Sequence, residues 1–242
     1  MRRDQPEHRG VDDLLSDPFG DAENELKYEV DRFRLEAIAT LLALGCRPDP
    51  RYPANTVVSL YYDTPERTLL REKLDSHYLK TKVRLRWYED PGGHAGPAML
   101  EVKRRIGSRR RKARLPAGLT GEEISRLGFH SPRLLALPDR LRAAGIEVAG
   151  PLLPLLEVRY RRRRFVEPLS GARIALDTLI RGVGPERAPS RPLAGGVLEI
   201  KGAGPTPPAV LTHLVAAGCY ETSFSKYFRC YRQLAGEARW VG

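Results

Sequence analysis

The stretch that decides the fold is KVRLRWY, residues 82–88. Its cations, Lys82, Arg84 and Arg86, fall at every second position, and apolar residues fill the positions between them. Alternation with a period of two is typical of a β-strand that has one cationic face and one apolar face. If both faces are enclosed, the cations must meet an anion inside the fold, because an unpaired buried charge is prohibitive.

The bulk composition points to an anionic partner. The chain has 242 residues, and its 41 Lys and Arg outnumber its 30 Asp and Glu, for a net charge of +11. This balance favours a phosphorylated small molecule, nucleic acid or an acidic membrane surface as the partner. Three cysteines without a CxxC pair argue against a disulfide framework or a zinc knuckle. With no apolar run long enough to span a bilayer and no signal-peptide pattern, we expect a cytoplasmic protein without a transmembrane segment. Oligomeric state and any membrane-protein partner stay open.

Hydrophobic periodicity and turn residues predict an α+β domain of about seven or eight strands, nearly all in hairpin order. We expect a flexible tail over residues 1–20, a single domain over 21–236 and a tail over 237–242. The predicted strands are 25–30, 55–64, 82–88, 98–106, 155–168, 172–180 and 196–202. Helices are expected at 32–44, 65–75, 207–219 and 223–236, and in a helical insertion over 118–150. Residues 109–112, RRRK, are expected in a solvated turn, and their role is open.

The cationic alternation recurs along the predicted strands. Charged positions that share one face are Glu25, Lys27 and Glu29; Glu101, Lys103 and Arg105; Arg162 and Arg164; Arg173 and Asp177; Glu199 and Lys201. A single strand of this kind is most simply the wet face of an antiparallel sheet. Repetition with Lys and Arg in excess, and almost no Thr, Ser or Gln, instead favours closure around an anion. We therefore predict an antiparallel closed β-barrel with a basic tunnel and with helices packed outside.

Several common catalytic and binding motifs are missing. The sequence has no GxxxxGK[ST] loop, no GxSxG elbow and no ligand spacing among its five His residues. A Walker-type nucleotide site, covalent catalysis and a His-based metal site therefore have no candidate residues.

Eight motifs occur in one order along the chain: ELKYEV, SLYYDT, KVRLRWY, LEVKRR, YRRRRF, RIALDT, LEIK and FSKYFR. Together they resemble the VTC (vacuolar transporter chaperone) polyphosphate polymerase domain of the CYTH, or triphosphate tunnel metalloenzyme, superfamily, from about Glu25 to Leu234. The resemblance implies a barrel around a basic tunnel. It also implies transfer of the γ-phosphate of ATP to inorganic polyphosphate, with Mn²⁺ or Mg²⁺ as the cofactor.

The resemblance also implies the site residues. The phosphate-binding set would be Lys27, Arg84, Arg86, Lys103, Arg162, Arg173, Ser225 and Lys226. Glu199 would be the metal-binding carboxylate, and the catalytic set would be Arg84, Arg86, Lys103, Arg162 and Glu199. Arg162 is chosen among the arginines of YRRRRF by its spacing from Tyr160.

Two other functions remain open. Transfer to a phosphate acceptor needs positioning and charge neutralisation but no general base, which is consistent with a polymerase. A metal-dependent inorganic triphosphatase would instead want a carboxylate to orient water, and Glu25, Glu29 or Glu101 could do so. A non-catalytic polyanion-binding or nucleic-acid-binding barrel rests on the net charge alone. No sequence signature of a nucleic-acid-binding module is present, so we expect no specific nucleic-acid partner.

Overall fold

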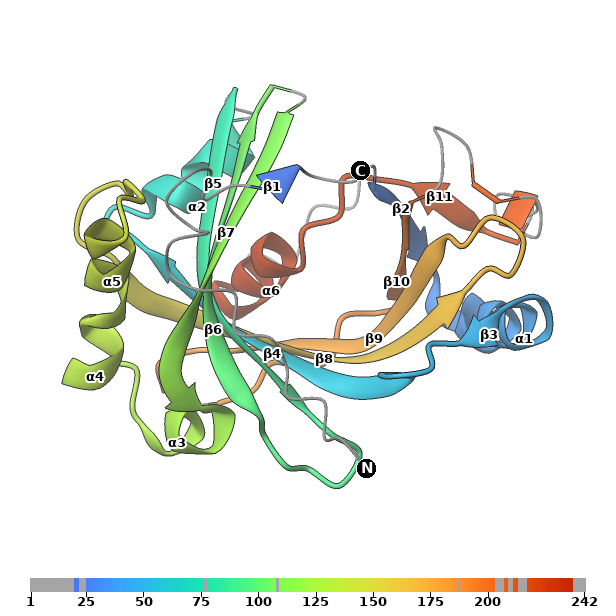
Figure 1. Ribbon diagram of the computed structural model, residues 1–242, viewed down its shortest axis with the longest axis horizontal. Coiled ribbons are helices and arrows are strands. Elements are labelled where there is room, and N and C mark those ends of the chain that lie inside the picture. Colours follow the sequence, from blue (N-terminus) through green and yellow to red (C-terminus); the bar gives the residue numbers. More distant parts are fainter. Residues whose placement is uncertain are drawn as a thin grey trace, which may run out of the picture.

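Antiparallel pairing joins all strands of the computed structural model into one curved sheet of 11 strands (Figure 1). The structure describes residues 20–21, 25–75, 78–107, 109–186, 188–202, 207–208, 211–212 and 217–236. The strand order is β1-β7-β6-β5-β4-β8-β9-β10-β2-β11, and β3 pairs with β8 outside this path. Five of the ten described strand pairs join strands that are consecutive in sequence, so the predicted hairpin order holds for half of the pairs. The predicted tails lie outside the described residues, except for Gly20.

The structure contains the predicted strands, some of them longer than predicted, and four additional strands. The strands are β1 (Gly20–Asp21), β2 (Glu25–Val30), β3 (Arg47–Pro48), β4 (Ala54–Asp63), β5 (Leu79–Glu89), β6 (Pro97–Ile106), β7 (Arg109–Thr120), β8 (Leu153–Val166), β9 (Arg173–Val183), β10 (Gly196–Lys201) and β11 (Cys219–Glu221). Seven of them match the predicted strands, although β5 and β9 run longer. The four additional strands are β7 and the short β1, β3 and β11.

The predicted turn at residues 109–112 is wrong, because these residues open strand β7. The turn precedes the RRRK run: Ile106 and Arg109 are cross-strand partners, and the two residues between them connect β6 to β7. Gly107 has φ +58, the left-handed conformation that two-residue hairpin turns favour. The backbone of the RRRK run is therefore part of the sheet and not a solvated loop.

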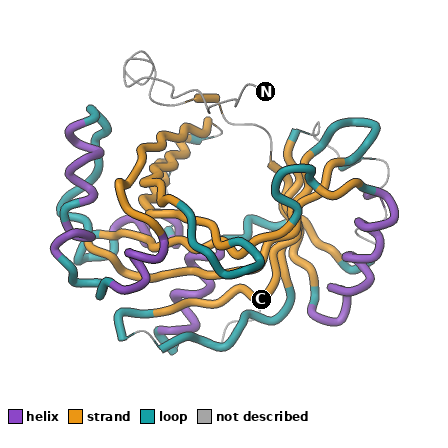
Figure 2. The backbone as a smooth tube through the Cα atoms, turned by 60° about the horizontal axis from the view of Figure 1, so that its bottom comes forward, coloured by secondary structure: helices purple, strands orange, loops and turns teal. Residues whose placement is uncertain are grey.

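The predicted closed barrel is not confirmed. At the two ends of the sheet, β1 pairs only with β7 and β11 pairs only with β2, so no ladder joins the ends within the described residues. The sheet nevertheless curls strongly. Its β5–β7 wall faces its β10–β2 wall across a concave interior (Figures 1 and 2).

Helices cover two parts of the convex face. The insertion supplies α3 (Gly121–Arg126), α4 (Pro132–Leu135) and α5 (Leu137–Ala143), which cover the outer face of β5–β7. There the apolar residues between the cations of KVRLRWY, Val83, Leu85 and Trp87, are fully buried. The predicted helix at 32–44 is a 3-10 turn (Arg32–Arg34) followed by α1 (Leu35–Gly45), which packs on the outer faces of β2, β9 and β10.

The prediction that helices pack only outside the barrel is wrong for the last helix. Helix α6 (Lys226–Leu234) lies within the concave interior and packs against β8 and β9 (Figure 1). Its buried side chains Tyr227 and Cys230 join an apolar cluster with Val57, Leu156 and Val158 from the concave face. One region of that face is therefore apolar and filled, and the cations are confined to the rest.

Two other helix predictions have different outcomes. The helix expected at 65–75 is α2 (Thr68–Leu74), which begins after a turn. Of the thirteen residues of the helix expected at 207–219, six lie outside the described residues; the other seven include no α-helical residue, and the last of them, Cys219, opens β11. Within the described part of the chain, no helix combines the length and apolar character that crossing a membrane requires.

Candidate functional site

The register of β5, β6 and β7 places cations side by side on the concave face. Lys82 pairs with Lys103, and Lys103 pairs with Lys112 on the next strand. Like charges directly opposite each other destabilise a sheet. The arrangement therefore provides a row of positive charge that an anion in the interior would stabilise.

A single buried carboxylate, Glu101 of β6, is surrounded by cations from this wall. Its Oε2 accepts hydrogen bonds from Nε and Nη2 of Arg84, at 2.8 and 2.6 Å. Nitrogens of Arg86, Lys112 and Arg114 lie 3.8, 3.7 and 3.4 Å from its oxygens. Burial favours the neutral acid, but the surrounding cations outweigh burial and hold the pKa of Glu101 well below its usual range. Four cations therefore face one negative charge.

A second cluster, between β8, β9, β10 and α6, is balanced in charge. Arg162 donates to both carboxylate oxygens of Asp177, at 2.6 and 2.7 Å, and to Oε2 of Glu199, at 2.6 Å. Nζ of Lys226 lies 2.6 Å from Asp177 and 2.7 Å from Glu199. Burial opposes the charged form of Lys226, but Asp177 and Glu199 outweigh it and raise its pKa above the ordinary value. Two cations and two carboxylates thus neutralise each other.

The pKa of Lys103 reflects the excess positive charge on the β5–β7 wall. Burial, followed by the repulsion of Arg84, Lys201 and Arg86, lowers its pKa to about 6, although Glu25 opposes this shift. Glu25 itself is shared between Lys27, at 3.4 Å, and Lys201, at 3.7 Å. An anion in the interior would restore the charged form of Lys103.

The structure places the sequence-predicted residues as follows. Arg84, Arg86 and Lys103 lie on the β5–β7 wall; Arg162, Glu199 and Lys226 form the balanced cluster; Lys27 lies opposite Glu199 in register; Ser225 caps α6; and Arg173 is exposed at the start of β9, opposite Lys201. Nζ of Lys82 donates to Oγ of Ser225 at 3.2 Å, which joins the β5 wall to α6. Eight of the nine predicted residues thus lie around one interior, and Arg173 lies at its rim.

Sequence reasoning missed four residues that contribute to the site. The strand pattern places Asp177 on a charged face. It does not predict that Asp177 pairs with Arg162 on the next strand, so it gives no reason to include Asp177 in the site. Lys112 and Arg114 were missed because their arginine run resembled a turn. Tyr61, whose hydroxyl accepts from Arg84 at 3.3 Å, lies in an apolar run that gave no polar signal. Alternation within RRRKAR was the one signal that could have identified the basic pair.

A sequence profile and two solved structures relate the chain to known proteins. The sequence profile of the VTC domain matches residues 22–235. A solved structure from Bacillus halodurans, described as a "putative adenylate cyclase", is 13% identical with a TM-score of 0.50, and the match covers 85% of this chain and 94% of that one. One from Vibrio parahaemolyticus with the same description is 18% identical with a TM-score of 0.41, covering 90% and 88%. No curated protein matches the chain.

The likeness to the Bacillus halodurans structure concerns the fold alone, because the identity is only 13%. The family assignment rests on the profile match, which spans the sheet from β2 to β11 and also α6. These are the elements that line the concave interior. The chain therefore belongs to the VTC domain family.

Proposed function

We propose that this protein is a polyphosphate polymerase that transfers the γ-phosphate of ATP to a growing inorganic polyphosphate chain in its basic interior. The observation that carries the proposal is the excess of cations on the β5–β7 wall. Four cations face the single carboxylate of Glu101, and Lys103 beside them has a pKa lowered to about 6. Such a wall is stabilised by a compact polyanion, and a triphosphate is one.

The chemistry asked of the residues is positioning and charge neutralisation. Arg86 provides a planar guanidinium group that can grip phosphate oxygens, and Lys103 adds a point charge. Arg84 already donates to Glu101 and Tyr61, so it contributes its charge and its remaining N–H groups. On the opposite side, Arg162 and Lys226 are held in place by Asp177 and Glu199. The acceptor phosphate is already an anion at neutral pH, so the reaction needs no general base.

The family resemblance implies a divalent metal, Mn²⁺ or Mg²⁺. The described residues contain no group of three His, Cys, Asp or Glu that could hold a metal by itself. One carboxylate together with substrate phosphates is a common way to hold Mg²⁺. Glu199 on the concave face would meet that requirement if the metal replaced its 2.7 Å contact with Lys226. A bound metal would neutralise phosphate charge, while Glu199 would hold it and Arg162 would orient Glu199 through the 2.6 Å hydrogen bond.

An inorganic triphosphatase is the alternative within the same fold, and the structure gives it less support. All three carboxylates that could orient water already bind cations: Glu25 pairs with Lys27, Glu29 with Arg229, and Glu101 with its cluster. Cations also hold the pKa of Glu101 well below its usual range, which makes its carboxylate a weak base. Transfer to phosphate rather than to water is therefore favoured.

A nucleic-acid-binding barrel also has little support. The cations of the β5–β7 wall face an interior shared with α6, and Nζ of Lys82 contacts Ser225 of that helix. A duplex would have to contact the convex face instead, where Arg161 and Arg163 of β8 are exposed. These two residues play no part in the proposed site.

The test is a product assay. Purified protein is incubated with ATP and Mn²⁺ or Mg²⁺, and the products are resolved on a polyacrylamide gel. Long polymer that a polyphosphatase degrades is the expected result. Free phosphate alone would favour the triphosphatase, and no metal-dependent product together with no triphosphate binding would refute both enzymatic functions.

A further inference from the structure

Asp63, at the end of β4, is a buried carboxylate to which the proposed chemistry gives no role. It is only 1% exposed, and all its acceptor positions are used. Its Oδ1 accepts from the backbone N–H groups of Thr64 and Leu69, at 2.8 and 2.9 Å. Its Oδ2 accepts from the N–H of Leu70, at 3.0 Å, and from the hydroxyl of Tyr227, at 2.8 Å. One carboxylate therefore holds the first turn of α2 and also the first turn of α6.

The bond to Tyr227 goes beyond what α2 requires. Three backbone donors, two of them in the first turn of α2, already bind this carboxylate, and the Tyr227 hydroxyl comes from a residue 164 positions away in sequence. The ring of Tyr227 also stacks on Tyr61, with 4.4 Å between centroids and an interplanar angle of 12°. The Tyr61 hydroxyl in turn accepts from Arg84 of the cationic wall. Tyr227 is thus fixed at its hydroxyl and along its ring.

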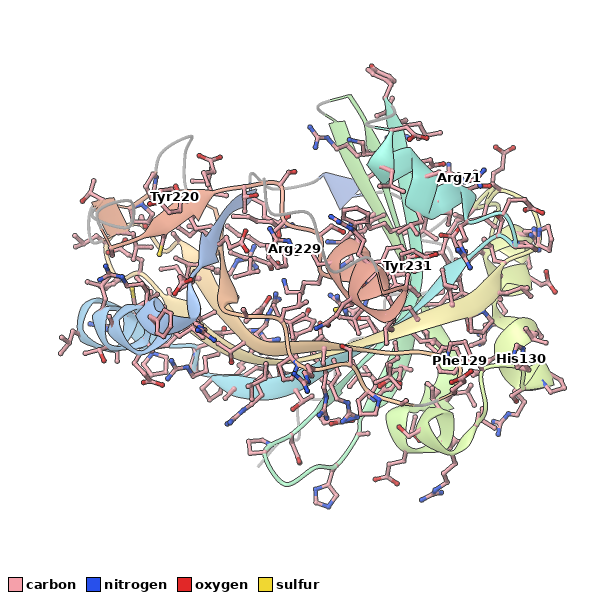
Figure 3. The ribbon with its side chains drawn as sticks, turned by 180° about the vertical axis from the view of Figure 1, so that it is seen from behind. Arg71, Phe129, His130, Tyr220, Arg229 and Tyr231 are labelled. Atoms are coloured by element: carbon pink, nitrogen blue, oxygen red, sulfur yellow. The ribbon has the colours of Figure 1, made fainter. Side chains whose placement is uncertain are left out.

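Tyr227 directly follows Ser225, the N-cap residue of α6, and Lys226, the first residue of α6, and both of these residues face the proposed site. Lys226 contacts Asp177 and Glu199, and Ser225 accepts from Lys82. Arg229, labelled in Figure 3, lies one turn further along α6. It forms an ion pair with Glu29 of β2. Contacts to both walls therefore depend on where this helix lies in the interior.

We propose that Asp63 and Tyr227 are positioning residues, which fix α6 so that Ser225 and Lys226 are presented to the phosphate substrate. Neither touches the reacting atoms. The role rests on the proposed function, because it names what holds part of the same site in place. Without the Tyr227 hydroxyl, Asp63 still caps α2, while α6 loses its only hydrogen bond to Asp63 in the described part of the chain.

The test compares two buried tyrosines that differ in the sheet face they occupy. Tyr227→Phe removes the hydroxyl that binds Asp63. Tyr62→Phe removes a similarly buried hydroxyl that donates to the carbonyl of Leu134, at 3.0 Å, on the opposite side of the sheet. Calorimetric titration with inorganic triphosphate should show about tenfold weaker binding for Tyr227→Phe and unchanged binding for Tyr62→Phe.

Two further measurements separate positioning from a general loss of stability. In a Lys226→Ala background, Tyr227→Phe should weaken binding by clearly less than it does in the wild type, because one of the two residues that it positions is already gone. Hydrogen exchange of the α6 amides in the free protein should be faster in Tyr227→Phe and not in Tyr62→Phe. A folded Asp63→Asn variant should show the same weaker triphosphate binding and the same faster hydrogen exchange of the α6 amides.

The outcomes are distinguishable. Equal losses of affinity in both phenylalanine variants, or an undiminished effect of Tyr227→Phe in the Lys226→Ala background, would overturn the positioning role. Wild-type protein that binds no triphosphate would overturn the proposed function and this role with it. Triphosphate binding by the wild type and by Tyr227→Phe with the same affinity would overturn the positioning role alone.

Discussion

Triphosphate binding should be accompanied by proton uptake at Lys103. In the free protein, burial and neighbouring cations lower the pKa of this amine to about 6. At pH 8 only about 1% of Lys103 is then protonated. A bound polyanion favours the ammonium form, so the pKa rises toward its ordinary value of 10.5. We expect roughly one proton to be taken up for each triphosphate bound at pH 8.

The same shift fixes the sign of two pH dependences. Because binding takes up a proton, affinity should fall as pH rises above 6, by up to about tenfold per pH unit. In the free protein the folded state holds fewer protons on Lys103 than the unfolded state between pH 6 and 10.5. Stability of the free protein should therefore rise with pH across this window, by at most about 1.4 kcal/mol per unit from this group.

The assay is calorimetric titration of triphosphate at pH 8 in two buffers with different ionisation enthalpies. Lys103→Met, which cannot be protonated, is the matched variant and should lose most of the uptake. Lys112 is a second contributor, because burial and Arg114 also lower its pKa, so some uptake should remain. Binding without proton exchange in the wild type, or equal uptake in Lys103→Met, would refute the reasoning.

Three further substitutions test other parts of the structure. Glu199→Gln should abolish metal-dependent turnover and weaken Mn²⁺ binding in the presence of triphosphate; full turnover would show that the metal assignment is wrong. Arg86→Ala should weaken triphosphate binding by about 1.5–3 kcal/mol and leave any duplex DNA binding intact; the reverse pattern in parallel titrations would favour the nucleic-acid binder. Gly121→Ala should lower the unfolding free energy by about 1–3 kcal/mol, because the new methyl group would meet the ring of Trp87 at 2.1 Å. The measurement is denaturant unfolding. Gly128→Ala is the control, because a methyl group there meets nothing within 4 Å.

The faces of the strands could be predicted from the sequence, but their partners could not. Period-two alternation placed Val83 and Leu85 on the apolar side and Arg84 on the concave side, and the structure has them so. Alternation says nothing about register, however, so the pairing of Arg162 with Asp177 had no signal. Register depends on turn geometry and on tertiary packing, which act across the whole sheet.

The position of α6 had no signal either. Its amphipathic pattern predicted a helix, and Tyr227 and Cys230 form the buried side as such a pattern requires. The pattern does not say which face of a sheet a helix covers. Because the concave face of β8 carries Leu156, Val158 and Tyr160 beside its arginines, it offers an apolar surface that α6 can bury. A purely cationic interior would not have accepted the helix.

The distribution of carboxylates makes the two sides of the interior chemically different. On the β5–β7 wall, four cations share the single charge of Glu101, so a phosphate group can bind there while the ion pair between Arg84 and Glu101 stays intact. On the other side, Arg162 and Lys226 are already neutralised by Asp177 and Glu199. A phosphate that binds there must share these cations with the carboxylates, which weakens the gain from binding. The β5–β7 wall should therefore provide most of the affinity for the phosphate chain, and the side formed by α6, β9 and β10 should mainly determine where the reacting phosphate lies.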